Sequence, residues 1–205
     1  MMPNSVPSQL FLRTWLLWFA GTLAFPIAGL AGTAVAGPVD DAGAALVGGA
    51  VAGLVIGAGQ ALASRRRLDP RRWIPATAVG MGAGLVVGAW AVGYDTSLPD
   101  LAAMGALTGL VLGAAQALAL PSRATHRWIW AIAMPALWAL GWTVTTLGGI
   151  HVEDQFTNYG LYGALTFSAL SGLLLHRLLP YRETTQPGNT PVVASPTSSL
   201  PSRKG

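Results

Sequence analysis

The chain has no cysteine, little charge and a single lysine. These shortages exclude some kinds of chemistry and some classes of protein. Without cysteine, disulfides, thiolate catalysis and cysteine metal sites are excluded. Charged residues make up 10% of the chain, whereas soluble domains carry about 25%. By contrast, 52% of the 205 residues are hydrophobic and 26 are glycine. This composition suits a bilayer better than water.

The few charges lie outside the long apolar runs. No Asp, Glu, Lys or Arg falls in the middle of any predicted span. Because intramembrane charges usually mark ion paths and proton relays, their absence argues against a proton-driven pump. A channel lined by hydroxyls and amides stays open as an alternative. The net charge of +4 does not indicate nucleic-acid binding, since the basic residues end apolar runs and membrane topology accounts for them.

The apolar runs predict an all-α, polytopic transmembrane helix bundle over residues 11–180. Its six spans are predicted at about 11–36, 42–63, 73–92, 101–120, 128–148 and 159–179. Residues 1–10 form a polar N-terminal segment, and residues 181–205, rich in Pro, Ser and Thr, predict a disordered cytoplasmic tail. The first run is either a retained span or a signal peptide cleaved after Ala36, and its length favours retention.

Charge predicts the orientation of the spans. With six spans, all twelve Lys and Arg residues fall on one side of the membrane, and six of the eight acids fall on the other. The positive-inside rule then places both termini in the cytoplasm of a bacterial cell, with the bundle in the inner membrane. The arginines that set this topology are Arg65, Arg66, Arg67, Arg71, Arg72, Arg123 and Arg127. They also suit contact with anionic lipid headgroups.

A repeat supports the same number of spans. Gly53 and Gly109 are 56 residues apart, as are Gln60 and Gln116. This interval corresponds to two spans and two turns, and a weaker third copy begins at Gly163. We therefore expect three helical hairpins of parallel orientation around an axis normal to the membrane, with the even-numbered spans inside. The alternative is that small residues at four-residue spacing are simply how membrane helices pack.

Small residues at this spacing predict the packing faces of the helices. They are Gly49, Gly53, Gly57, Gly80, Gly84, Gly88, Gly105, Gly109, Gly113 and Gly172. One polar group continues each of three such faces toward the basic side, and these groups are Gln60, Gln116 and His176. If the even spans meet centrally, these side chains form either a polar gate or structural bonds between helices. The fifth span carries four tryptophans, for which we expect a lipid-facing surface.

No catalytic, metal-binding or cofactor-binding constellation is recognisable. Ser171-Gly172 resembles the serine of rhomboid membrane proteases, but Ala169 replaces the glycine two positions earlier and no later span supplies a histidine. His151, Glu153 and Asp154 share one loop, where such residues are usually solvated. We expect a non-enzymatic packing or assembly component, and the alternative is a small transporter or channel with its path between the repeats. A protein partner or a homo-oligomer fits either hypothesis.

Overall fold

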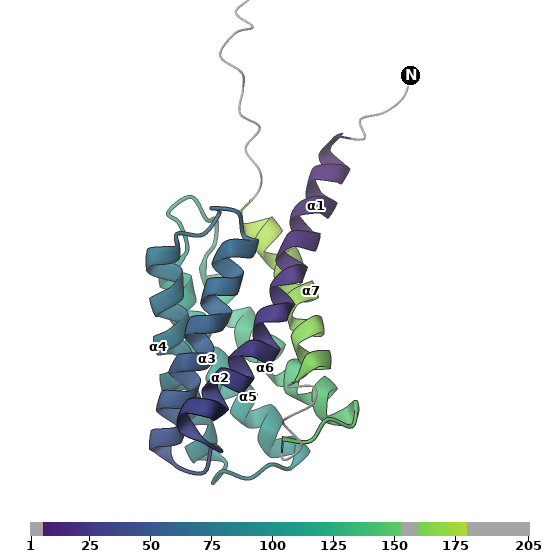
Figure 1. Cartoon of the computed structure of the whole chain (residues 1–205). Helices are drawn as coiled ribbons and strands as arrows, with labels where there is room; N and C mark the ends of the chain where they lie inside the picture. Colours follow the sequence, from purple (N-terminus) through teal and green to yellow (C-terminus); the bar gives the residue numbers. More distant parts are fainter. Residues whose placement is uncertain (1–5, 153–159, 180–205) are drawn as a thin grey trace, which may run out of the picture.

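The computed structural model describes residues 6–152 and 160–179, and all regular structure in these ranges is helical (Figure 1). In chain order the elements are α1 (Val6–Ala20), the short 3₁₀ helix η1 (Gly21–Leu23), α2 (Ala24–Ala36), α3 (Ala42–Ala63), α4 (Pro70–Ala91), α5 (Leu98–Ala119), α6 (Trp128–Leu147) and α7 (Leu161–Leu178). The predicted all-helical fold is confirmed for these residues. The predicted tail at 181–205 lies outside them.

Five stretches of the described chain are long and apolar enough to cross a membrane. They are Gln9–Ala36, which joins α1, η1 and α2, and the helices Ala42–Ala63, Pro70–Ala91, Leu98–Ala119 and Trp128–Leu147. Large apolar side chains project outward from them, such as Leu62 and Leu118, which are 81% and 78% exposed. These features indicate a multi-pass membrane protein. Helix α7 is not among the five, so the sixth span remains a prediction.

Polar side chains set where two of the helices begin. The Asp69 carboxylate accepts from the backbone N–H of Arg71 at 3.0 Å, and the Ser97 hydroxyl accepts from that of Asp100 at 3.4 Å. Such caps satisfy N–H groups that have no partner within the helix. Helices α4 and α5 therefore start three residues earlier than the apolar runs predict.

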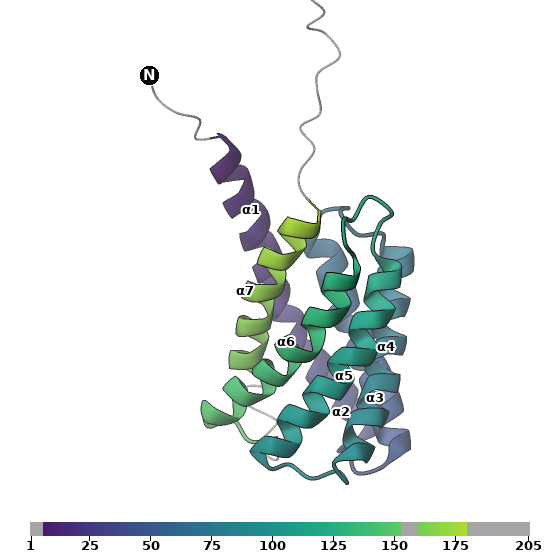
Figure 2. The ribbon, with the colours of Figure 1, turned by 180° about the vertical axis from the view of Figure 1, so that it is seen from behind.

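The helices form a closed ring in which each helix from α2 to α6 packs against the next along the chain (Figure 1, Figure 2). The contacts run from α2 through α3, α4, α5 and α6 to α7, and α1 closes the ring against α7. Within the described residues, no backbone contact joins α3 to α5 or α5 to α7. The expectation that the even-numbered spans meet at the centre is therefore wrong. The physical reason is that their small-residue faces point at sequence neighbours.

Three glycine stripes point the same way around the ring. The stripe on α3 faces α4 and consists of Gly49, Gly53 and Gly57. The stripe on α4 faces α5 and consists of Gly80, Gly84 and Gly88. The stripe on α5 faces α6 and consists of Gly105, Gly109 and Gly113. A Cβ atom placed on Gly53 would lie 2.6 Å from the carbonyl oxygen of Thr77. Backbone approach this close requires glycine and gives the helices a large packing area. Gly172 of α7 instead faces the Trp15 and Trp18 rings of α1.

The connections alternate between two ends of the ring. The α3–α4 and α5–α6 connections carry arginines and lie at the top of Figure 1, and we call this the basic end. The α2–α3 and α4–α5 connections carry Asp40, Asp41 and Asp95, and we call theirs the acidic end. At the basic end the Arg123 guanidinium donates to the carbonyl oxygen of Arg67 at 3.0 Å, which joins the two turns.

Candidate functional site

Three tryptophans fill the centre of the ring in its basic half. Trp18 of α1, Trp73 of α4 and Trp130 of α6 are all buried. The Trp130 ring meets Trp73 edge to face with the ring centroids 5.8 Å apart, and meets Trp18 in the same way at 6.4 Å. Edge-to-face contacts are a favourable arrangement for aromatic rings. We call these three residues the tryptophan plug.

Each indole N–H of the plug donates a hydrogen bond to a side chain on the preceding helix of the ring. Trp73 Nε1 donates to Gln60 Oε1 of α3 at 2.9 Å, and Trp130 Nε1 donates to Gln116 Oε1 of α5 at 3.0 Å. Because a buried polar group without a partner is costly, these bonds allow the rings to be fully enclosed.

The third tryptophan closes the same pattern. Trp18 Nε1 of α1 donates to the Ser171 hydroxyl of α7 at 3.0 Å. Helix α1 follows α7 around the ring although it comes first in the chain. Ser171 is the residue that resembles the serine of rhomboid proteases. In this fold it is completely buried and accepts this hydrogen bond. The arrangement amounts to three donor–acceptor pairs on three pairs of helices.

The predicted polar cluster forms only in part. Gln116 Nε2 donates to Thr77 Oγ1 of α4 at 3.0 Å, and Thr77 in turn donates to the carbonyl oxygen of Trp73 at 2.8 Å. Gln60 and Gln116 are therefore linked through α4, without a direct bond between them. His176 lies apart, with its ring edge-to-face against Phe11 at a centroid distance of 4.5 Å.

The tryptophans are what sequence reasoning missed. Trp130 was expected on a lipid-facing surface, and that expectation is wrong because its N–H requires the Gln116 side chain. Trp138 and Trp142 of the same helix also face inward. The sequence signal is a spacing: Gln60 is followed by Trp73 after 13 residues, and Gln116 is followed by Trp130 after 14 residues. Only Trp128, which is 57% exposed, fits the expectation.

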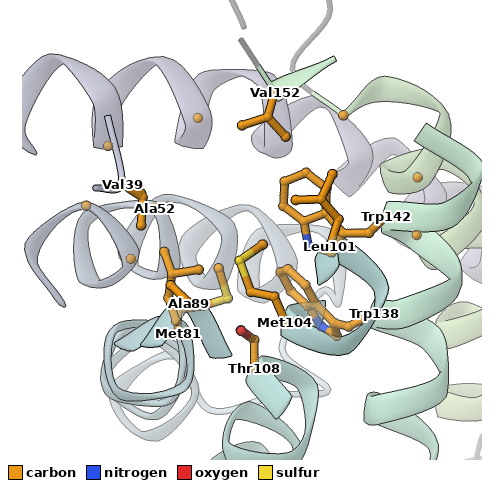
Figure 3. A pocket seen from close by; sticks show the side chains of 18 of the residues that line it. Val39, Ala52, Met81, Ala89, Leu101, Met104, Thr108, Trp138, Trp142 and Val152 are labelled. Atoms are coloured by element: carbon orange, nitrogen blue, oxygen red, sulfur yellow. The ribbon is translucent and has the colours of Figure 1, made fainter. Parts of the chain in front are cut away.

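An apolar cavity of about 380 Å³ occupies the acidic half of the ring (Figure 3). Side chains of Met81, Met104 and Trp138 border it from three different helices. Its lining comes from α2 (Phe25, Ala28, Gly29, Gly32, Thr33), α3 (Gly48, Gly49, Ala52, Ile56), α4 (Met81, Leu85, Ala89), α5 (Leu101, Met104, Thr108), α6 (Leu137, Trp138, Gly141, Trp142, Thr145), α7 with its preceding residue (Gly160, Gly163, Ala164, Phe167) and the connections (Gly37, Pro38, Val39, Tyr94, Asp95, Thr96, Val152). Small-molecule sites commonly have volumes of about 300–1,000 Å³ and apolar walls.

Polar groups around the cavity are few and mostly engaged. The Thr108 hydroxyl donates to the Gly84 carbonyl oxygen at 3.2 Å, and the Thr145 hydroxyl accepts from the Gly163 N–H at 3.0 Å. Trp138 Nε1 is buried and has no hydrogen-bond partner among the described residues. Asp95 brings a carboxylate to the rim at the acidic end. The chemistry of the cavity therefore favours an apolar occupant with any polar group at the rim.

The cavity ends at the tryptophan plug. Phe167 lines the cavity and also belongs to the apolar cluster that contains Trp18, Trp73 and Trp130. On α3, the lining residue Ile56 is followed one turn later by Gln60, which holds Trp73. The plug thus lies between the cavity and the basic end.

One of the seven topology-setting arginines also holds a helix end. The Arg67 guanidinium donates to the carbonyl oxygens of Leu175, at 3.4 Å, and of Leu179, at the end of α7. The Leu175 carbonyl oxygen also accepts from the Leu179 N–H at 2.9 Å, so the guanidinium adds a second donor to it. A cation at this place complements the negative end of the helix dipole. Arg65, Arg66, Arg71, Arg72, Arg123 and Arg127 are exposed at the basic end.

Within residues 6–152 and 160–179, no group of three or more acidic or histidine side chains lies close enough to hold a metal ion. His151 is exposed, while Glu153 and Asp154 fall outside the described residues. Comparison of the chain with protein-family models, with curated proteins and with solved structures finds no match.

Proposed function

We propose that this protein is a non-enzymatic component of the bacterial inner membrane that holds an apolar molecule in the cavity of its acidic half. The observation that carries this proposal is the 380 Å³ apolar cavity, closed toward the basic end by the tryptophan plug. A void lined by apolar side chains lacks partners for its wall atoms, and an apolar occupant restores those contacts.

The proposal includes six spans in three parallel hairpins, with both termini in the cytoplasm. Helix α7 supports the sixth span because it fills the place between α6 and α1 and receives the Trp18 bond on Ser171. The three donor–acceptor pairs support the repeat. The arginines at the basic end support an orientation with that end in the cytoplasm. The cavity then lies in the outer half of the membrane.

The plug favours a binding protein over a channel or transporter. A path between the two ends would have to pass Trp73 and Trp130, which are completely buried and bonded to Gln60 and Gln116. Opening that path would break at least these two hydrogen bonds and the edge-to-face contact. A channel remains the alternative hypothesis, and ion or solute flux through proteoliposomes is the observation that would favour it.

Photolabelling with a diazirine derivative of octanol tests the proposal on the purified protein in mild detergent. We expect adducts on Met81 and Met104, which are buried cavity residues. The variant Ala52→Trp places an indole in the cavity and should lose these adducts. The matched control Ala103→Trp, on an exposed position of α5 outside the lining, should keep them. Wild-type protein without adducts on either methionine would contradict the proposal.

A further inference from the structure

Helices α2 and α7 diverge toward the acidic end of the ring. In the basic half, α1 packs against α7, where Trp15 Nε1 donates to the Ala169 carbonyl oxygen at 3.0 Å. Beyond η1 the chain turns toward α3, so that a Cβ atom on Gly32 of α2 would lie 2.9 Å from the Gly48 carbonyl oxygen. Helices α2 and α7 touch least of all the helix pairs in contact. Both views show them separating toward the acidic end (Figure 1, Figure 2).

The facing surfaces of α2 and α7 both line the cavity. On α2 the lining residues recur at helical spacing, with Phe25, Gly29 and Thr33 one turn apart. On α7 they include Ala164, which has a small side chain, and Gly163, which lies in close contact with Gly141 of α6. The Phe25 and Phe167 rings meet with centroids 5.6 Å apart. Toward the acidic end from this pair, the lining continues with Gly29 on α2 and Ala164 on α7, and we call this part of the cavity wall the lateral slot.

The side of η1 and α2 that points away from the cavity carries exposed apolar side chains. Leu23 of η1 and Ile27 and Leu30 of α2 are 70%, 59% and 50% exposed, and they belong to a stretch apolar enough to cross a membrane. In a bilayer the phase next to these side chains is hydrocarbon. A molecule that passes from this phase into the slot remains in an apolar environment throughout. An acyl chain of a neighbouring lipid therefore meets no barrier from exposure to water.

We propose that the occupant of the cavity is an acyl chain of a membrane lipid, which enters sideways between α2 and α7 while its headgroup stays at the acidic end. This inference rests on the proposed function and names the ligand class and the entry route. The chain fits the cavity because its walls are apolar, and the headgroup stays outside because the polar side chains of Asp95 and Thr96 lie at the rim.

A phospholipid with a diazirine in the middle of one acyl chain, reconstituted with the protein in proteoliposomes, tests the route. We expect lipid adducts on Met81 and Met104 in the wild type. Gly29→Trp should block the slot and lose these adducts, while photoreactive octanol still labels the same methionines. Leu30→Trp is the matched control, since Leu30 is the next residue, is exposed and does not line the cavity. A second blocking variant is Ala164→Trp on α7.

The outcomes separate the two proposals. If octanol labels the methionines and the lipid chain does not, the cavity binds apolar molecules but the lateral route is wrong. Lipid adducts that persist in both Gly29→Trp and Ala164→Trp would overturn the route as well. So would the loss of octanol labelling from both variants, because the slot would then not be separable from the cavity. Absence of both labels from the wild type would overturn the proposed function itself.

Discussion

Gln116 holds two helices at once, because its side-chain oxygen accepts from Trp130 Nε1 at 3.0 Å while its nitrogen donates to Thr77 Oγ1 at 3.0 Å. The corresponding side chain of the repeat, Gln60, has one such bond, from Trp73. The two amides occupy equivalent places in sequence, but Gln116 joins three helices where Gln60 joins two. This difference gives a quantitative expectation.

Replacing Gln116 by Leu should destabilise the protein more than replacing Gln60 by Leu. The first change leaves the Trp130 N–H unsatisfied and removes the donor to Thr77, and each such buried loss costs about 1–3 kcal/mol. Thermal unfolding in mild detergent, followed by circular dichroism, measures the effect. Adding Trp130→Phe to Gln116→Leu removes the unpaired N–H and should recover part of the loss. Equal destabilisation by the two glutamine variants would contradict the assignment.

The glycine stripes predict where bulk is not tolerated. In Gly109→Leu the new Cβ would lie 2.6 Å from the Met134 carbonyl oxygen, so α5 and α6 must separate. Overpacking of this kind costs about 1–3 kcal/mol. The same substitution at Ala114, an exposed position of the same helix, is the control and should leave the unfolding temperature in detergent unchanged. An unchanged unfolding temperature in Gly109→Leu, as in the control, would place the Gly109 face against lipid.

We expect Arg67, but not its neighbour Arg66, to stabilise the C-terminal end of α7. Arg67→Gln removes the charged donor to the Leu175 and Leu179 carbonyl oxygens. Arg66→Gln removes the same charge from an exposed position one residue away. Hydrogen exchange of the last turn of α7 should become faster in Arg67→Gln only. Equal exchange in the two variants would mean that charge at the basic end, rather than this contact, holds the helix.

The proposed orientation can be tested without background labelling, because the chain has no cysteine. Ala42→Cys places a thiol at the acidic end and Ser122→Cys places one at the basic end, and both positions are exposed. A membrane-impermeant maleimide added to intact cells should label Ala42→Cys alone. Permeabilised cells should show both labels, which confirms that the Ser122→Cys thiol is reactive. Labelling of Ser122→Cys in intact cells would reverse the orientation.

The helices could be predicted from the sequence because their signals are local. Apolar runs place α3 correctly to the residue, and the glycines at four-residue spacing on α3 and α5 mark faces that lie against other helices. The starts of α4 and α5 were predicted too late because hydropathy does not register capping side chains such as Asp69 and Ser97. A cap belongs to the helix although it is polar.

The arrangement of the helices and the cavity could not be predicted in the same way. A glycine stripe says that another helix lies close by, but it does not say which one. Whether a glycine stripe packs against the next helix in the chain or against another even-numbered span at the centre depends on the arrangement of all the helices. The cavity has no residue pattern of its own, since it is lined by six helices and their connections, from Phe25 to Phe167.

The bond between Trp18 and Ser171 joins residues 153 positions apart and closes the ring. Translation proceeds from the N-terminus, so α1 enters the membrane before its partner α7 has been synthesised. The pairs Trp73–Gln60 and Trp130–Gln116 each need only one hairpin and can form as soon as that hairpin is made. Assembly of the plug is therefore completed by α7, the last of the described helices to leave the ribosome, and a nascent chain arrested before Ser171 carries a Trp18 indole without its acceptor.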